Sequence, residues 1–176
     1  MQLTNDHAAI DRILKELQTA LRNHDIKTVH ARLDLFWARL AVHIRAEHLH
    51  LFPTVLSHTK KSSLAEARSV IAQLRLDHDF FMHQLALAVA IMRELLTLPM
   101  QVIDPEGLSN IENIILEVEE RLVKHNDLEE TQVYHWATIL LNSQEQATLA
   151  SQIAAELHNR PPRFALSTWM DETVAR

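Results

Sequence analysis

Glycine is almost missing from this chain, since only Gly107 occurs among its 176 residues. Phosphate-binding loops and dinucleotide-binding turns need several glycines, because glycine adopts a positive φ easily and lets the backbone approach a ligand closely. Folds rich in β-strands need glycines in their turns for the same reason. The single glycine therefore excludes a P-loop and a dinucleotide fingerprint, and it indicates an all-α fold.

Cysteine is absent, which excludes disulfides, thiolate metal sites and cysteine nucleophiles. The net charge is −6 with no block of Lys or Arg, which argues against nucleic acid as a partner. The first residues, "MQLTNDHAAI", lack the basic and apolar regions of a signal peptide. The longest apolar run, "LALAVAIM" at 85–92, is far too short to span a bilayer. We therefore expect a cytoplasmic protein with no membrane and no nucleic-acid partner.

The apolar residues, 47% of the chain, recur at the spacing of an α-helix. Four long helices are predicted, at about 4–22, 26–58, 63–97 and 107–142, and a fifth at about 144–158. The predicted N-caps are Thr4 or Asn5 for the first helix, Ser62 or Ser63 for the third and Ser143 for the fifth. Pro53 is expected to kink the second helix or to restart it. Short connections favour an up-down-up-down four-helix bundle over 1–142. Residues 143–176 are expected to form an additional C-terminal helix and tail that pack on the same domain.

Each long helix carries a seam of core-facing positions, with alternating steps of three and four residues. The four seams are His7, Ile10, Leu14, Leu17 and Leu21; Leu33, Phe36, Leu40, His43 and Glu47; Ile71, Leu74, His78, Phe81, Leu85, Ala88 and Met92; and Ile111, Ile115, Val118, Leu122, His125 and Glu129. Four histidines and two glutamates thus face the core. The apolar side of the fifth helix is expected at Ala147, Ala150, Ile153, Ala154 and Leu157.

These six polar residues are expected at one level of the bundle. In an antiparallel pair of helices, two residues are level when both are equally far from the connecting turn. His7 and His43 are each 18 residues from a turn near residue 25, and His78 and His125 are at nearly equal distances from the loop near residue 102. The sequence therefore predicts a single layer of four imidazoles and two carboxylates.

Such a buried layer is costly unless cations pair with it. A His and a Glu four residues apart lie about 40° apart around a helix, so both can bind one site. Two metal ions fit the count, with two imidazoles each and both glutamates able to bridge them. A bridging oxo or hydroxo group would bring each metal to about five ligands and leave an open position.

The residues next to this layer have the following expected places. His48 could lie beside the site or at the surface, His50 could be an extra ligand, Glu130 is expected at the surface, and His83 lies about 140° from His78. The side chains expected to wall the ligand pocket are Ile10, Phe36, Leu40, Phe81 and Leu122. The same five residues also fit plain core packing.

The order of these residues resembles the hemerythrin-like (HHE cation-binding) domain family. "HIRAEHLHLFPTVL" is similar to that family's His-x-x-x-Glu-Glu-x-x-Leu-Phe-Pro signature, with His48 where a second Glu is frequent. "HNDLEETQVYHW" is similar to the second signature without its Pro, and the resemblance covers residues 7 to about 136. It implies a four-helix bundle with a non-haem di-iron centre whose ligands are His7, His43, Glu47, His78, His125 and Glu129.

The resemblance also narrows the function. Oxygen-carrying hemerythrins have a further His where this chain has Met82, so the ligand set is more similar to repair-of-iron-centres proteins and to iron- and oxygen-sensing domains. The expected function is binding of oxygen, nitric oxide or peroxide at two iron ions, for sensing, storage or detoxification. The alternatives are a di-iron enzyme that reduces nitric oxide or peroxide, an iron-handling or iron–sulfur repair protein, and a metal-free interaction module. The fifth helix and the tail either cover the bundle or pair two subunits into a homodimer.

Overall fold

The computed structural model describes residues 2–97 and 105–159, and within these ranges it contains helices and no strand. This confirms the predicted all-α class. The elements are α1 (Gln2–Arg22), α2 (Ile26–Ala46), η1 (Glu47–Leu51), α3 (Phe52–His58), α4 (Leu64–Thr97), α5 (Pro105–Leu128), η2 (Glu129–Tyr134), α6 (His135–Leu140) and α7 (Ser143–His158). The predicted tail with Trp169 and most of the predicted loop near residue 102 lie outside the described residues.

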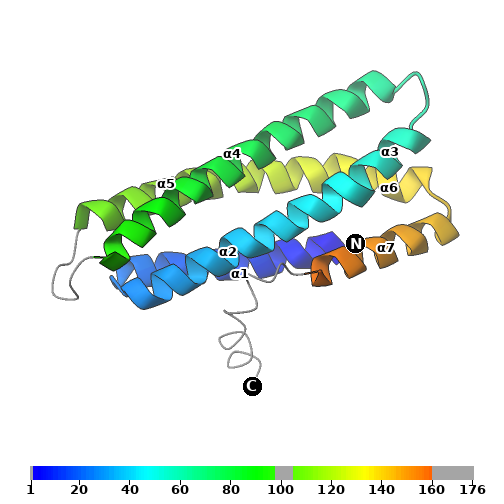
Figure 1. The fold of residues 1–176 in the computed structure, drawn as a ribbon. Coiled ribbons are helices and arrows are strands. Elements are labelled where there is room, and N and C mark those ends of the chain that lie inside the picture. The colour runs from blue at the N-terminus through cyan, green and yellow to red at the C-terminus, as the bar shows by residue number, and fades with distance from the viewer. Residues whose placement is uncertain (1, 98–104, 160–176) are drawn as a thin grey trace.

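The long helices lie side by side (Figure 1). Helix α1 packs along α2 and α4 along α5, and these pairs also meet through α2 with α4 and α1 with α5. Helix α7 lies beyond the first residue of α1, roughly in line with it, and packs on α1, α2 and η1 (Figure 1). Every predicted seam residue of the four long helices is buried, with at most 5% of its surface exposed. The helical periodicity thus identified the interior correctly.

The interior contains two apolar clusters. The first cluster extends from Ile10 to Leu122 and includes all five residues expected to wall a pocket. The second cluster is built around Leu3, Phe52, Ile71 and Val133, together with residues of α7. Along each long helix, the six polar seam residues lie where one cluster gives way to the other. The polar layer is therefore closed by apolar side chains at both ends.

The helix starts differ in part from the predictions. Thr4 and Asn5 lie inside α1 and do not cap it, because the helix already begins at Gln2. Helix α7 is capped by Asn142, whose side chain accepts from the backbone N–H of Gln144 and Glu145, so Ser143 is its first residue and not its cap.

The buried side of α7 agrees with the prediction at Ile153 and Leu157 and differs from it elsewhere. Ala147 and Ala150 are exposed, and the buried residues are Leu149, Ile153 and Leu157. Their spacing of four places them in one row along the helix, directed at the second cluster.

The second and fourth predicted helices are interrupted by π-helical segments, η1 and η2. In η1 the N–H of Phe52 bonds to the carbonyl of Glu47, five residues back. Pro53, which has no N–H, follows in the first turn of α3, so a new helical segment starts at this proline, which is one of the two predicted outcomes. Proline does not explain η2, which has none. The feature that both segments share is a buried glutamate as their first residue, Glu47 or Glu129.

One helix of the described residues, α4, is long and apolar enough to cross a membrane by length and composition alone. The core helix of a globular protein passes the same test, and α4 contributes a full buried seam to the interior. The absence of a membrane partner stays a prediction.

Candidate metal centre

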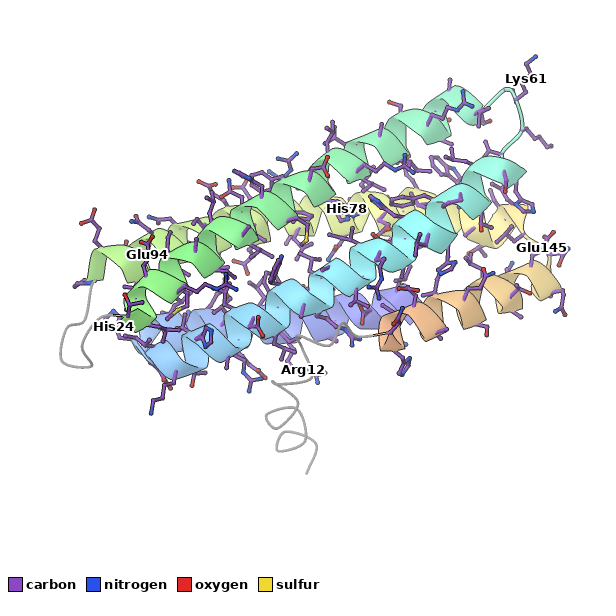
Figure 2. All side chains as sticks on the ribbon, in the orientation of Figure 1. Arg12, His24, Lys61, His78, Glu94 and Glu145 are labelled. Carbon is purple, nitrogen blue, oxygen red and sulfur yellow. The ribbon has the colours of Figure 1, made fainter. Side chains whose placement is uncertain are left out.

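The structure brings the six polar seam residues together in one buried layer. None of them is more than 5% exposed. Figure 2 shows His78 midway along the molecule, between the helices. Two groups of potential ligand atoms, each within 4.8 Å of one another, are formed: group 1 by His7, His43, Glu47 and Glu129, and group 2 by Glu47, His78 and His125. Glu47 belongs to both groups, whereas Glu129 belongs to group 1.

The same nitrogen of each histidine faces the centre of its group. Nε2 of His7 lies 3.1 Å from Nε2 of His43, and Nε2 of His78 lies 3.2 Å from Nε2 of His125. The carboxylates close the gaps: Oε1 of Glu47 is 2.7 Å from His43 Nε2, and its Oε2 is 3.1 Å from His78 Nε2. Glu47 therefore connects the two groups.

The opposite nitrogen, Nδ1, has a partner in all four histidines. The pairs are His7 with Glu130 at 2.7 Å, His43 with Asp6 at 2.9 Å, His78 with His48 at 2.9 Å and His125 with Asp77 at 3.4 Å. The carboxylates can only accept, so they assign a proton to Nδ1 of their histidines, and the Nε2 of a neutral His48 can do the same for His78. With Nδ1 protonated, the neutral imidazole directs the lone pair of Nε2 at the centre, which is the form that binds a metal.

Two aspartates and two arginines extend this network. Asp6 and Asp77 each precede a candidate ligand in the sequence, but each contacts a histidine of the neighbouring helix. Arg39 forms an ion pair with Asp6, and Arg121 lies 2.7 Å from Asp77. Burial raises the pKa of Asp6 and Asp77, but their histidine and arginine partners outweigh it and hold both pKa values below the usual range.

The carboxylate oxygens show that the layer fits cations. Oε1 of Glu129 is buried and forms no hydrogen bond with any residue that the structure describes, and the two buried oxygens of Glu47 face the Nε2 atoms of His43 and His78. A buried charged oxygen without a partner is costly. Because lone pairs of nitrogen and oxygen converge on two points, two cations would satisfy them together, and iron or zinc accepts such a mixture of imidazole and carboxylate ligands.

Without metal, protons occupy part of this layer. Burial lowers the pKa of His43, but the charge of Glu47 and the bond to Asp6 raise it well above its usual value. Burial raises the pKa of Glu47, but the charge of His43 holds it well below its usual value. The pKa of His7 is also raised, because its contact with Glu129 outweighs burial. Metal binding must therefore displace protons from these nitrogens.

Sequence reasoning did not predict Tyr134, nor the contacts that Glu130 and His48 make with the site. Tyr134 is buried, and its hydroxyl lies 3.1 Å from Glu129 Oε2 and 3.3 Å from His7 Nε2. Glu130 was expected to be a surface acid and is exposed, as predicted, but its carboxylate also contacts Nδ1 of His7. The sequence left open whether His48 lies beside the site or at the surface, and the structure places it against His78. The aspartates were missed as well, although the repeated "DH" of 6–7 and 77–78 was a usable signal.

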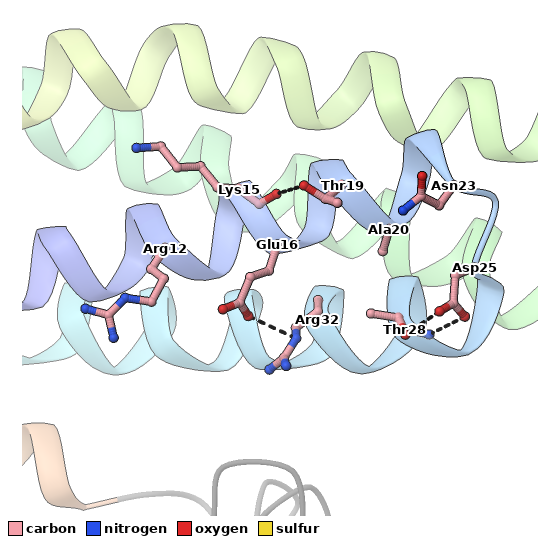
Figure 3. A pocket seen from close by; sticks show the side chains of 9 residues that line it. All are labelled: Arg12, Lys15, Glu16, Thr19, Ala20, Asn23, Asp25, Thr28 and Arg32. Atoms are coloured by element: carbon pink, nitrogen blue, oxygen red, sulfur yellow. Dashed lines mark hydrogen bonds and ion pairs between the residues drawn. The ribbon is translucent and has the colours of Figure 1, made fainter. Parts of the chain in front are cut away.

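The remaining predicted positions lie as follows. His50 points toward α7, with Nε2 4.0 Å from Glu156, and His83 is exposed on α4. Among the five predicted pocket residues, Phe81 contacts the layer, its ring 5.3 Å from that of His125. A groove on the outer side of α1 and α2 is separate from the layer (Figure 3). It is lined by charged residues such as Glu16 and Arg32, which form an ion pair at 3.1 Å, and by none of the six.

Asp77 provides a test of the outer network. The substitution Asp77→Asn keeps the size of the side chain but removes the charge that faces His125 Nδ1. Loss of such a partner costs about 10- to 100-fold in metal affinity. We expect that loss in competition with a chromophoric chelator, and none in Asp79→Asn, an exposed aspartate two residues further on α4. Equal affinities of both variants and the wild type would contradict this role of Asp77.

Comparison with known proteins agrees with this site. Residues 1–137 match the family model described as Hemerythrin HHE cation binding domain. No curated protein and no solved structure matches the chain. The matched span contains all six candidate ligands and ends before α7. Because it covers well over half of the chain, the resemblance seen in the two His-x-x-x-Glu signatures is confirmed, and the chain belongs to the hemerythrin HHE cation-binding domain family.

Proposed function

We propose that this protein holds two iron ions in its polar layer and binds a small molecule there, such as oxygen, nitric oxide or peroxide, for sensing, storage or detoxification. The ligands of the iron ions would be His7, His43, Glu47, His78, His125 and Glu129. In this proposal the four long helical segments form an up-down-up-down bundle, and a bridging oxo or hydroxo group completes the pair of metals. The protein would act in the cytoplasm. Its net charge of −6 disfavours nucleic acid as a partner.

One observation carries the proposal. All four histidines have their Nδ1 atoms occupied by outer partners, so their Nε2 atoms converge with two buried carboxylates on two points. A helical module without metal would gain nothing from this arrangement, because it leaves Oε1 of Glu129 buried without a hydrogen bond and needs bound protons to balance Glu47.

The number of ligand atoms favours binding of a further small molecule. Group 1 offers four ligand atoms and group 2 offers three, whereas iron in such sites takes five or six ligands. Positions are therefore left for a small molecule at metals enclosed by two apolar clusters. When bound, the metals would supply electrons and a binding position. The chain's residues hold the metals, orient the imidazoles and keep water out.

Metal content is the first measurement. Aerobically purified protein is expected to hold about two iron ions per chain by elemental analysis for iron, zinc and manganese. Nitric oxide and azide should then bind with saturation and be released on dilution. Two zinc ions would contradict the iron proposal. A folded protein that takes up no metal on reconstitution would overturn it entirely.

The same preparation distinguishes the alternatives. A di-iron enzyme would consume nitric oxide or peroxide over many turnovers with a reductant, whereas a binding protein would take up one equivalent. An iron-handling protein would release its iron to a mild chelator within minutes. The buried layer, with its candidate ligands at most 5% exposed, favours slow release.

A further inference from the structure

The polar layer consists of two corresponding halves. In each half one helix supplies an Asp-His pair, and the next supplies an arginine, a histidine and a glutamate at intervals of four. The first half has Asp6, His7, Arg39, His43 and Glu47, and the second has Asp77, His78, Arg121, His125 and Glu129. In both, the Asp contacts the Arg and the His of its neighbour helix. A π-helical segment begins at each glutamate.

The glutamate of each half also contacts a histidine of the other half. Glu47 of the first half approaches His78, and Glu129 of the second half approaches His7. The residue after each glutamate contacts the outer nitrogen of the same histidine: His48 contacts His78, and Glu130 contacts His7. The correspondence thus extends beyond the ligands.

The fifth residue after each glutamate is aromatic and stacks on that histidine. The ring of Phe52 lies 5.9 Å from the ring of His78 with 10° between their planes, and the ring of Tyr134 lies 5.8 Å from that of His7 with 20°. In an α-helix a residue five positions on would lie about 140° away. A π-helical turn holds more residues than an α-helical turn, so the angle between the glutamate and the fifth residue after it is smaller, and both rings reach the layer.

The two aromatic residues differ by a single hydroxyl group. The hydroxyl of Tyr134 is directed at metal-facing atoms, 3.1 Å from Glu129 Oε2 and 3.3 Å from His7 Nε2. The other outer partners contact Nδ1 nitrogens, which face away from the metals. Within residues 2–97 and 105–159, Tyr134 is the one side chain outside the six that hydrogen-bonds a metal-facing atom.

Metal binding would change the partners of this hydroxyl. A metal at group 1 uses the lone pair of His7 Nε2 and an oxygen of Glu129, which are the two atoms that the hydroxyl now contacts. Nε2 of His7 then has no lone pair left for the hydroxyl, and a metal-bound carboxylate oxygen is a weaker acceptor, so the O–H would favour a better acceptor at the metal. A small molecule at the open position of that metal would lie within its reach. Phe52 offers no hydrogen to a molecule at group 2.

We propose that the Tyr134 hydroxyl donates a hydrogen bond to the small molecule, which therefore binds at the metal held by His7 and His43. The acceptor would be a small anion or diatomic molecule with an exposed lone pair. Tyr134 is then a specificity-determining residue, and it makes the two metals chemically unequal beyond the additional carboxylate of group 1. This inference rests on the proposed function, because it requires that a small molecule binds to the metals.

Azide binding to the iron-loaded full chain tests the inference. Three proteins are compared: the wild type, Tyr134→Phe, and the control Thr131→Val, which removes an exposed hydroxyl from the same π-helical segment. All three should hold the same amount of iron per chain. Tyr134→Phe should bind azide about 10- to 100-fold more weakly, as expected for a lost hydrogen bond to a charged acceptor. Its azide stretching frequency in the infrared should also shift. Thr131→Val should bind azide as tightly as the wild type.

Each other result has a definite meaning. Equal affinity and an unchanged stretching frequency in Tyr134→Phe would overturn the inference while leaving the proposed function intact. Loss of iron from Tyr134→Phe would assign the tyrosine to metal retention instead, and would also overturn it. Iron-loaded wild type that binds neither azide nor nitric oxide would overturn the proposed function itself.

Discussion

Replacing Glu47 and Glu129 together with alanine is expected to reduce the metal content from about two ions per chain to none. Glu47 belongs to both groups of ligand atoms and Glu129 to the first. Their removal leaves histidines alone, without the negative charge that balances the metal ions. Elemental analysis after reconstitution with excess iron would measure the loss.

The same variant should lose the stabilisation that metal supplies. A ligand that binds only the folded state at 1,000 times its Kd adds about 4 kcal/mol to the free energy of unfolding. For a chain of this size that is a rise in Tm of about 10 °C. We expect this rise for the wild type on adding metal, and none for the double variant.

A matched control separates these effects from a general loss of acidic residues. Glu117 and Glu120 are exposed on α5, and alanine at both positions should leave metal content and Tm unchanged. Circular dichroism of the metal-free double variant should show the same helical content as the wild type. Full retention of two metals by the Glu47 and Glu129 variant would contradict the assignment of these ligands.

The stabilisation that metal supplies is also expected to grow as pH rises through neutrality. In the metal-free protein the pKa of His43 is raised well above 6.5, so its contribution to stability is complete below 6.5 and is lost as pH rises through the folded value. The pKa of Glu47 is held well below 4.5, so its contribution is present above 4.5 and is lost as pH falls through the folded value. The metal-free protein should therefore be most stable in mild acid.

Metal has the opposite preference, because it competes with protons for His43 and His7. For each proton displaced, the metal affinity should rise about tenfold per pH unit. The difference in Tm between metal-bound and metal-free protein should thus be small at pH 5.5 and large at pH 8. Calorimetric titrations in buffers with different ionisation enthalpies would count the protons released. A pH-independent affinity with no proton release would contradict the raised pKa values, and His83→Ala, an exposed histidine on α4, should behave as the wild type.

The sequence predicted those features of the candidate site that follow from regular α-helical geometry. The spacing of three and four residues placed all six polar residues in the core, and distances from the turns placed them at one level. Each is now seen in one buried layer. Prediction failed where the helix departs from 3.6 residues per turn. Tyr134 lies five residues after Glu129, which on an α-helix would face elsewhere, and the π-helical segment η2 brings it to the layer.

The partners of the histidine Nδ1 atoms could not be predicted from the sequence, for a different reason. Asp6 precedes His7 in the sequence but contacts His43, and Asp77 precedes His78 but contacts His125. Neighbouring residues on a helix point about 100° apart, so Asp6 cannot face the same point as His7. Its partner depends on which helix packs beside α1, and helical periodicity contains no information about that. For the same reason the sequence did not predict the contacts that Glu130 and His48 make with His7 and His78.

The sequence alone therefore determined the all-α class, the buried seams and the two His-x-x-x-Glu pairs, because these depend on spacing within a single helix. Tertiary structure decided the rest. It decided that α7 completes the second apolar cluster beyond the first residue of α1, that Glu47 connects both groups, and that a hydroxyl faces one half of the layer and a phenyl ring the other. These features depend on contacts between helices and on two π-helical turns, and neither follows from the periodicity of any one helix.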